Sequence, residues 1–245
     1  MLSDSPKLSK EEIRRKIWAL MEETGISRFP KPVYGRIPNF VGSNIAAQKL
    51  AEQWEFKRAK VIKVNPDSPQ RMVRFLALLN GKTLLMPTPR LSSGFLLLEP
   101  RKIPKRAYED ASSIRGAFKY GEICSIDEIP NVDLIVAGSV AVSKDGVRVG
   151  KGGGYSEIEY GILRELGVVD EKTPIFTTVH DIQVVDFVPK DVYDLIVDAI
   201  ITPTKVIRIN DAGERPKGIM WDRIEIERIN EIPPLIQLRK LKSLI

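Results

Sequence analysis

The chain has 245 residues, a formal net charge of +6 and a single cysteine, and it is 43% hydrophobic and 29% charged, which is ordinary for a globular protein with a sizeable core. No apolar run approaches the roughly 18 residues of a membrane span, and no apolar segment near the N-terminus suggests a secretory signal. Because Cys124 has no second cysteine to pair with, we expect a reducing, cytoplasmic location.

The first predicted element is a helix that begins after Ser9. Ser9 is a good N-cap, acidic residues follow it, and apolar residues then recur at helical spacing up to Gly25, which suits a helix end. A proline-rich connector at residues 29–38 leads to a second helix, which we expect to start at Ser43.

The middle of the chain alternates between strand and helix patterns. Strands are predicted at residues 60–64, 82–87, 133–142, 174–179 and 199–209, with Pro203 at an edge or break, and helices at residues 69–79 and 157–166. This alternation predicts an α/β fold of three layers, α/β/α, with a mostly parallel sheet. Residues 90–126 are less periodic, and we expect an irregular insertion there above the strand ends.

The chain changes character beyond Asn210, where a turn is followed by closely spaced apolar residues. We therefore divide the chain into an α/β domain, residues 1–210, and a C-terminal tail, residues 211–245. The tail is expected to pack either on the domain or against another chain, and the second arrangement would produce a homodimer.

The segment that indicates chemistry runs from Gly146 to Tyr155, between a predicted strand and a predicted helix. Four glycines, at 150 and 152–154, surround Lys151, and Arg148 lies just before them. Glycine lets backbone N–H groups approach an anion closely, and the helix N-terminus adds the positive end of its dipole. These are the parts of a polyphosphate site, most simply for ATP. The spacing fits neither a P-loop nor a dinucleotide-binding motif, and a flexible glycine-rich turn with solvated cations is the competing interpretation.

Four ordered blocks resemble the 5-formyltetrahydrofolate cyclo-ligase family. They are Lys-x-x-Ile-Arg at residues 10–14, Gly-Lys-x-Leu-Leu-x-Pro at 81–87, the strand from Asp133 with the loop Gly-x-Arg-x-Gly-Lys-Gly-x-Gly-Tyr at 146–155, and Asp-x-x-x-Asp at 194–198. The resemblance covers residues 8–209. It implies a Rossmann-like fold of the NagB/RpiA/CoA-transferase type. The implied activity, in one-carbon metabolism, is ATP- and Mg²⁺-dependent closure of 5-formyltetrahydrofolate to 5,10-methenyltetrahydrofolate, with release of ADP and phosphate.

The chain departs from the family pattern at two places that concern the substrate. Ser156-Glu157 replaces the family's Tyr-Asp, and the family's Glu-x-x-Thr segment, which helps to hold the pterin or formyl group, has no counterpart in residues 65–71. Residues 86–91, 138–142, 157–161 and 179–186 are more similar to a paralogous branch, the methenyltetrahydrofolate synthetase domain-containing proteins. The resemblance therefore supports ATP binding more strongly than it supports a folate substrate.

The resemblance also implies the residues of the site. Nucleotide binding would fall to Lys10, Arg14, Gly150, Lys151, Gly152, Gly153, Gly154 and Tyr155, catalytic charge neutralisation to Lys151 and Arg148, and Mg²⁺ to Glu157 and Asp194. Asp198 ranks below Asp194 as a ligand, because it can equally be a structural acid beside its strand.

Several assignments have simpler competitors. Lys10 and Arg14, one helical turn apart, could be ordinary solvent-facing cations, and Tyr155 could pack under the loop instead of stacking on a ligand. His180, the only histidine, is a candidate for proton transfer, but a structural hydrogen bond is the better interpretation because no partner is identified.

Two other functions stay open. The protein could be an ATP-binding paralogue that acts on a different cofactor or vitamin intermediate, or a non-catalytic module that binds nucleotides or RNA. The basic residues are spread along the chain and aromatic residues make up only 7%, which disfavours RNA. We therefore expect a folate-type small molecule as the partner, and neither a membrane nor a nucleic acid.

Overall fold

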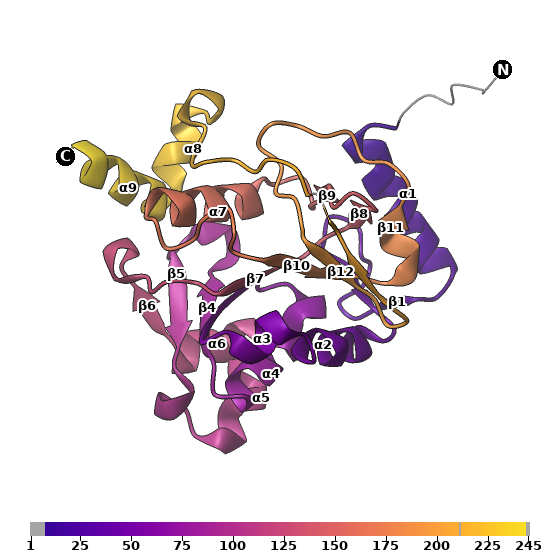
Figure 1. Cartoon of the computed structure of the whole chain (residues 1–245), viewed down its shortest axis with the longest axis horizontal. Coiled ribbons are helices and arrows are strands. Elements are labelled where there is room, and N and C mark those ends of the chain that lie inside the picture. The colour runs from indigo at the N-terminus through magenta and orange to yellow at the C-terminus, as the bar shows by residue number, and fades with distance from the viewer. Residues whose placement is uncertain (1–7, 211, 244–245) are drawn as a thin grey trace.

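A central mixed sheet organises the molecule (Figure 1). The structure, a computed structural model, describes residues 8–210 and 212–243, and within these ranges the sheet has eight strands in the order β13-β12-β10-β7-β3-β4-β5-β6. The strands are β3 (Val61–Val64), β4 (Thr83–Pro87), β5 (Phe95–Leu98), β6 (Glu122–Cys124), β7 (Leu134–Ala137), β10 (Ile175–Thr178), β12 (Ala199–Ile201) and β13 (Val206–Arg208). The central strands from β12 to β4 pair in parallel, and the antiparallel pairs lie towards the edges.

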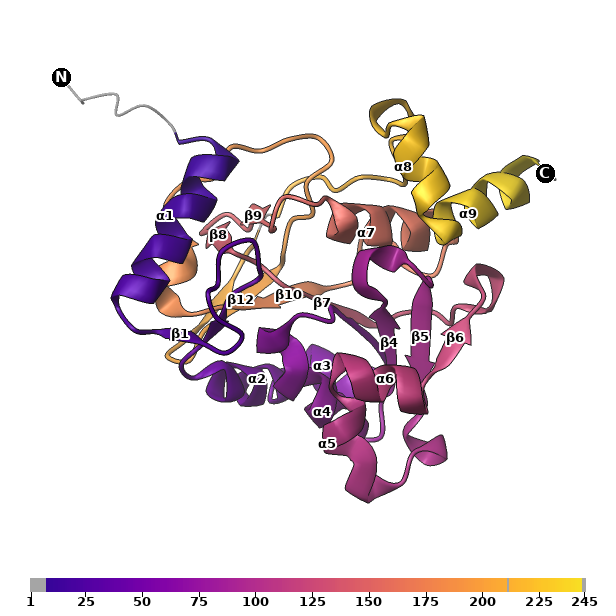
Figure 2. The same ribbon diagram turned by 180° about the vertical axis from the view of Figure 1, so that it is seen from behind.

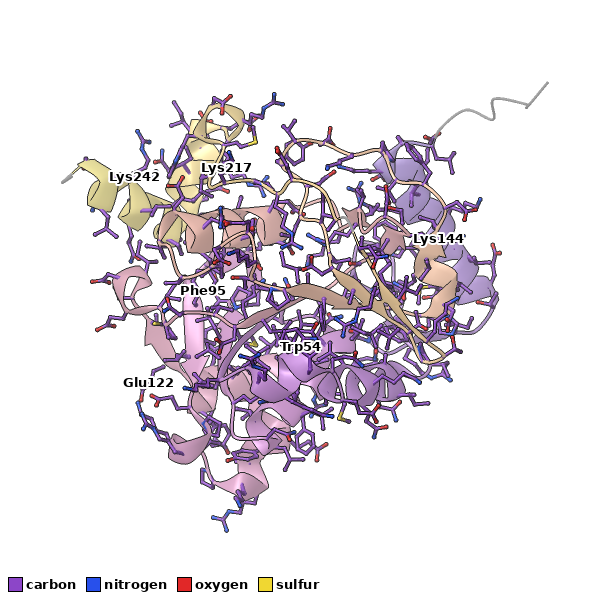
Figure 3. All side chains as sticks on the ribbon, in the orientation of Figure 1. Trp54, Phe95, Glu122, Lys144, Lys217 and Lys242 are labelled. Atoms are coloured by element: carbon purple, nitrogen blue, oxygen red, sulfur yellow. The ribbon has the colours of Figure 1, made fainter. Side chains whose placement is uncertain are left out.

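Helices cover both faces of this sheet, as Figures 1 and 2 show from opposite sides. One layer contains α2 (Ser43–Ala51), α3 (Trp54–Arg58), α4 (Arg71–Leu79), α5 (Tyr108–Ala111) and α6 (Ile114–Tyr120), and the other contains α7 (Tyr155–Glu165), α8 (Ile226–Glu231) and α9 (Pro233–Ser243). Side chains fill the space between the layers (Figure 3). Along β7, Leu134 and Val136 pack towards α2 and α4, whereas Ile135 and Ala137 pack towards α7 and α9. The predicted three-layer, mostly parallel fold is confirmed.

The N-terminal helix α1 (Lys10–Glu23) begins as predicted. The Ser9 hydroxyl accepts a hydrogen bond from the Glu12 backbone N–H, and the Glu12 carboxylate accepts one from the Ser9 backbone N–H. Helix α1 lies beside a second, three-stranded sheet of β11 (Val184–Val185), β8 (Ala141–Ser143) and β9 (Arg148–Val149), as Figure 2 shows. A two-stranded sheet of β1 (Ser27–Arg28) and β2 (Asn39–Phe40) completes the fold.

Two predicted strands are divided in the structure. Residues 133–142 form β7 and β8, which belong to different sheets, and the chain leaves the large sheet at Gly138. Apolar residues are buried in both pieces, so their pattern could not reveal the division. Residues 199–209 form the antiparallel pair β12 and β13 with Pro203 in the turn between them, as the break predicted there requires.

The expectation for residues 90–126 is wrong. The segment is not an irregular insertion, because Phe95–Leu98 pairs with β4 and Glu122–Cys124 pairs with β5, which extends the large sheet at its edge. Most of β5 is buried, Phe95 completely (Figure 3), so it has no alternation of polar and apolar residues by which to recognise a strand.

The described part of the C-terminal tail packs on α7. Ile229, Leu235 and Leu238 are buried in the same apolar cluster as Ile158 and Ile162 of α7. The homodimer through this tail and the proposed domain boundary stay predictions. Among residues 8–210 and 212–243, no helix has both the length and the apolar character that crossing a membrane requires.

Candidate functional site

The glycine-rich loop separates two cavities. It leaves β9 and enters α7 at Gly154, and its glycines 152 and 154 have φ angles of +101° and +63°, which favour glycine. A first cavity of about 450 Å³ and a second of about 530 Å³ lie on its two sides. Gly152 lines only the first cavity, Lys151 and Gly153 line only the second, and Gly150 and Gly154 line both. The loop thus presents successive residues to different cavities.

Helix α1 supplies two cations to the first cavity. Lys10 Nζ lies 2.7 Å from Asp194 Oδ1 and 2.6 Å from Asp191 Oδ2, and Arg14 Nε donates a hydrogen bond of 2.8 Å to the Gly150 carbonyl. Burial opposes the charge of Lys10, but the hydrogen bonds to Asp191 and Asp194 nevertheless raise its pKa. The side chains of Lys10 and Arg14 are only 17% and 14% exposed, so their interpretation as solvent-facing cations is wrong.

Arg148 lies at the junction of the two cavities and lines both. Its side chain is 1% exposed, and its two terminal nitrogens donate hydrogen bonds to the Gly138 carbonyl at 2.7 Å and to Glu157 Oε1 at 2.5 Å. Glu157 stands in the first turn of α7. The guanidinium therefore connects the β7–β8 junction to the start of α7 and fixes the base of the loop.

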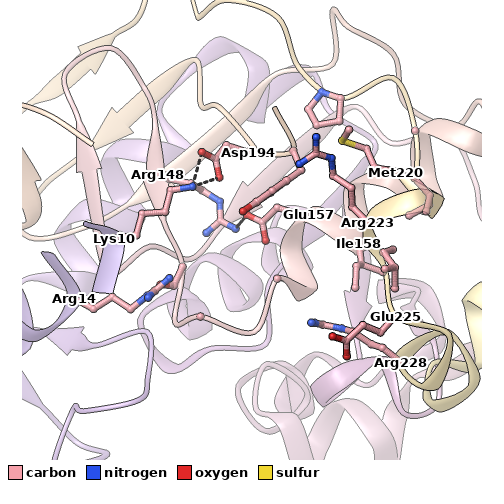
Figure 4. A pocket seen from close by; sticks show the side chains of 18 residues that line it. Lys10, Arg14, Arg148, Glu157, Ile158, Asp194, Met220, Arg223, Glu225 and Arg228 are labelled. Atoms are coloured by element: carbon pink, nitrogen blue, oxygen red, sulfur yellow. Dashed lines mark hydrogen bonds and ion pairs between the residues drawn. The ribbon is translucent and has the colours of Figure 1, made fainter. Parts of the chain in front are cut away.

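The two carboxylates predicted to bind metal both face the first cavity (Figure 4). Each already has a cationic partner, Arg148 for Glu157 and Lys10 for Asp194. Within residues 8–210 and 212–243 there is no cluster of three or more His, Cys, Asp or Glu side chains that could hold a metal ion. Two carboxylates nevertheless suit Mg²⁺, which often takes one or two carboxylates and completes its shell with phosphate oxygens and water.

Lys151 and Tyr155 face the second cavity, apart from the cations of α1. Lys151 Nζ lies 3.2 Å from Asp67 Oδ1, and its side chain is 44% exposed. The Tyr155 ring carries the Arg228 guanidinium at 5.0 Å from its centroid. The structure therefore brings Lys10, Arg14, Arg148, Glu157 and Asp194 to one cavity and places Lys151 and Tyr155 on the opposite side of the loop.

A buried ionic cluster, which the sequence analysis missed, lies beside the second cavity. Lys63 Nζ pairs with Glu159 Oε2 and donates a hydrogen bond of 3.1 Å to Asn65 Oδ1, and the Asn65 amide donates to Glu159 Oε2 at 3.2 Å. Asn65 and Glu159 line the cavity. Burial raises the pKa of Glu159, although the Lys63 charge opposes this shift. A lysine within the apolar strand Val61–Val64 is the signal that could have revealed the cluster.

The C-terminal tail also contributes to the first cavity, which the sequence analysis did not foresee. Figure 4 shows Met220, Arg223, Glu225 and Arg228 around the side of the cavity that faces away from Lys10. The only sequence signal was the apolar content of the tail, which says nothing about its position.

The remaining titratable residues of interest have structural roles. His180 caps a short helical turn, where its Nδ1 accepts a hydrogen bond of 3.3 Å from the Ile182 N–H, so the structural interpretation is confirmed. Burial lowers the pKa of His180, although Asp181 opposes the shift. Asp198 accepts a 2.7 Å hydrogen bond from the Ile175 N–H at its strand. These residues line neither of the two cavities.

Comparison with known proteins places this fold and loop in a family. The model of the 5-formyltetrahydrofolate cyclo-ligase family matches residues 6–203, and the chain belongs to this family. An NMR structure of Aquifex aeolicus 5,10-methenyltetrahydrofolate synthetase superimposes with a TM-score of 0.53 and 21% identity, and the match covers 88% of this chain and 99% of that one. This similarity shows a shared fold.

More similar sequences come from vertebrates. The chain is 44% identical over 238 residues to a methenyltetrahydrofolate synthase domain-containing protein of Mus musculus, and 42% identical over 237 residues to that of Homo sapiens. Each alignment covers 95% of this chain but only 64% and 62% of the respective relative. The chain therefore spans less than two thirds of the length of these relatives.

Proposed function

We propose that the protein converts 5-formyltetrahydrofolate to 5,10-methenyltetrahydrofolate with consumption of ATP. The observation that carries this proposal is the pair of cavities that meet at Arg148 and the glycine-rich loop. A reaction that transfers a phosphoryl group between two ligands needs both ligands within reach of one set of phosphate-binding groups. Family membership supports the identity of the two ligands.

ATP would occupy the first cavity. Lys10, Arg14 and Arg148 offset the charge of its phosphates there, and the glycines of the loop let backbone N–H groups approach the phosphate oxygens. Glu157 and Asp194 would hold Mg²⁺, which supplies charge neutralisation to the transferred phosphoryl group.

The formylated folate would occupy the second cavity, with Tyr155 against its ring and Lys151 near the formyl group. The formyl oxygen attacks the γ-phosphorus and ADP leaves. N10 then attacks the formyl carbon, the C–O bond breaks with release of inorganic phosphate, and N10 loses its proton. Lys151 would neutralise the charge of the phosphorylated oxygen from the side opposite the α1 cations.

The test is the growth of the methenyl absorbance when purified protein is mixed with 5-formyltetrahydrofolate, Mg²⁺ and ATP. We expect ATP-dependent turnover, with an assay that lacks ATP as the control. Absence of turnover under conditions where ATP binds would contradict the folate substrate and leave the nucleotide site standing.

A second candidate function retains ATP and changes the acceptor. The observation that favours it is the Lys63–Asn65–Glu159 cluster beside the second cavity, because a polar surface of this kind selects a ligand that can complete its hydrogen bonds. ATP hydrolysis that is stimulated by another heterocyclic carbonyl compound, but not by 5-formyltetrahydrofolate, would support this function over the first.

A further inference from the structure

We propose that the C-terminal segment 216–228 is part of the nucleotide site and that Arg223 binds phosphate there. The family match ends at residue 203, so this wall of the first cavity lies outside the matched cyclo-ligase region. The proposal rests on the proposed binding of ATP in the first cavity. It adds a specificity-determining element that the family-matched part of the chain does not contain.

The segment is held against α7 by specific contacts. The Ile219 backbone N–H donates a hydrogen bond of 3.1 Å to Glu165 Oε1, and Lys242 of α9 forms an ion pair with the same carboxylate. A Cβ atom at Gly161 would lie 2.5 Å from Ile219 Cδ1 and 3.2 Å from the Gly218 carbonyl oxygen. The approach of this segment to α7 therefore depends on a glycine at position 161, and the segment forms a fixed wall.

The wall gives the first cavity an apolar patch. Ile219, Met220 and Ile224 come from the segment, and Ile158 of α7 lies beside them. Lys10 and Arg14 line the other side, where α1 approaches the loop. A cavity that combines cations with an apolar patch suits a ligand with a polyphosphate and a planar ring, as a nucleotide has.

Two arginines of the segment have different environments. Arg228 donates a hydrogen bond to the Gly153 carbonyl and stacks on the Tyr155 ring, so it is occupied with the loop. Arg223 lines the cavity, and no hydrogen bond or ion pair joins its side chain to any other residue in 8–210 and 212–243.

Because their environments differ, Arg223 and Arg228 have separate roles. Arg228 is a positioning residue that supports the loop from behind Tyr155. Arg223 has donors available for a ligand anion, and it faces the cavity from the side opposite α1. A polyphosphate held by Lys10 and Arg14 would thus meet a further cation from the C-terminal segment.

Calorimetric titration of the purified chain with ATP, inorganic triphosphate and adenosine, in the presence of Mg²⁺, tests the proposal. For Arg223→Ala we expect roughly tenfold weaker binding of ATP and of triphosphate, because a charged hydrogen bond to phosphate is lost, with little change for adenosine. For Ile224→Ala we expect weaker binding of ATP and adenosine and unchanged binding of triphosphate. Arg239→Ala is the matched control, since Arg239 is exposed on α9 and lines neither cavity.

The outcomes separate this inference from the proposed function. ATP affinity that is unchanged in both Arg223→Ala and Ile224→Ala, but reduced in Arg14→Ala, would overturn the role of the segment and leave the nucleotide site intact. If the unmodified chain binds neither ATP nor triphosphate, the nucleotide site itself is wrong. Thermal unfolding of each variant distinguishes a loss of binding from a loss of folding.

Discussion

The two cavities on either side of the glycine-rich loop are built in different ways. The first combines the beginning of α1, the loop and the C-terminal segment, and most of its cations contact carboxylates or backbone carbonyls. The second lies over the strand ends, beside an ion pair whose two side chains are 2% and 4% exposed. The first cavity is thus suited to a highly charged anion, whereas the second, where Asn65 and Glu159 line the wall with Lys151, is suited to a ligand with polar groups along its edge.

The largest expected effect tests the buried cluster. Lys63→Met leaves the Glu159 carboxylate buried without its cation, and we expect a loss of about 3–5 kcal/mol in the free energy of unfolding, as is typical when one member of a buried pair is removed. Urea unfolding measures this loss. The double variant Lys63→Met/Glu159→Leu should recover most of it. A loss in the single variant no larger than that of the double variant would show that the pair is not a coupled unit.

The next effect tests whether Lys151 and Lys10, on opposite sides of the loop, act on different ligands. Lys151 lines only the second cavity, so Lys151→Ala should lower turnover roughly tenfold or more while the dissociation constant of ATP changes little. Lys10→Ala should weaken ATP binding itself. Calorimetry and the absorbance assay measure the two quantities separately, and Lys144→Ala, at an exposed lysine paired with Asp186, is the control. Equal losses of ATP affinity in Lys151→Ala and Lys10→Ala would remove the distinction between the two sides.

A smaller effect tests whether the position of the C-terminal segment 216–228 affects ATP binding. Gly161→Ala should weaken ATP binding by about threefold, although Gly161 does not line the cavity, because the new methyl group displaces Ile219 from α7. Alanine also favours the helix by about 1 kcal/mol over glycine, so the free energy of unfolding should change little. Adding Ile219→Ala to this variant should restore part of the affinity. Unchanged ATP binding in Gly161→Ala would show that the wall tolerates this displacement.

The smallest effect is a pH dependence of the free energy of unfolding, which arises from the ion pair between Lys10 and Asp191. The pKa of Lys10 is raised and that of Asp191 is lowered by their mutual hydrogen bond, so their contribution to stability is present between the two ordinary values of 3.8 and 10.5. It should decline as the pH falls below the ordinary value of Asp191 or rises above that of Lys10. The difference in unfolding free energy between the unmodified chain and Lys10→Met, followed against pH, measures it. A difference that is constant from pH 3 to 11 would contradict the pairing.

What the sequence could predict was local. The N-cap at Ser9, the position of the loop at residues 150–154 between a strand and a helix, and the alternation of strands and helices depend on neighbouring residues, and the structure agrees with each. The division of residues 133–142 was invisible because both pieces are apolar. Within residues 90–126, β5 was missed because all four of its residues are apolar and most are buried, so it has no alternating pattern.

The site itself needed the tertiary structure. Lys10 meets Asp194 across 184 positions of the chain, and Lys63 meets Glu159 across 96, so no local pattern contains either pair. The family resemblance supplied Lys10 and Asp194 as separate candidates but gave no indication that they bind each other. Likewise, the apolar residues of the tail predicted that it packs somewhere, but not that Arg223 would reach the first cavity.

The alternation of the glycine-rich loop has a consequence for its length. Since Lys151 lines the second cavity and Gly152 lines the first, inserting or deleting one residue before them would exchange the cavities that these two positions line. A lysine would then enter the first cavity, to which α1 already supplies positive charge, and the second cavity would lose the Lys151 ammonium group. We therefore expect this turn to accept changes of side chain much more readily than a change in the number of its residues.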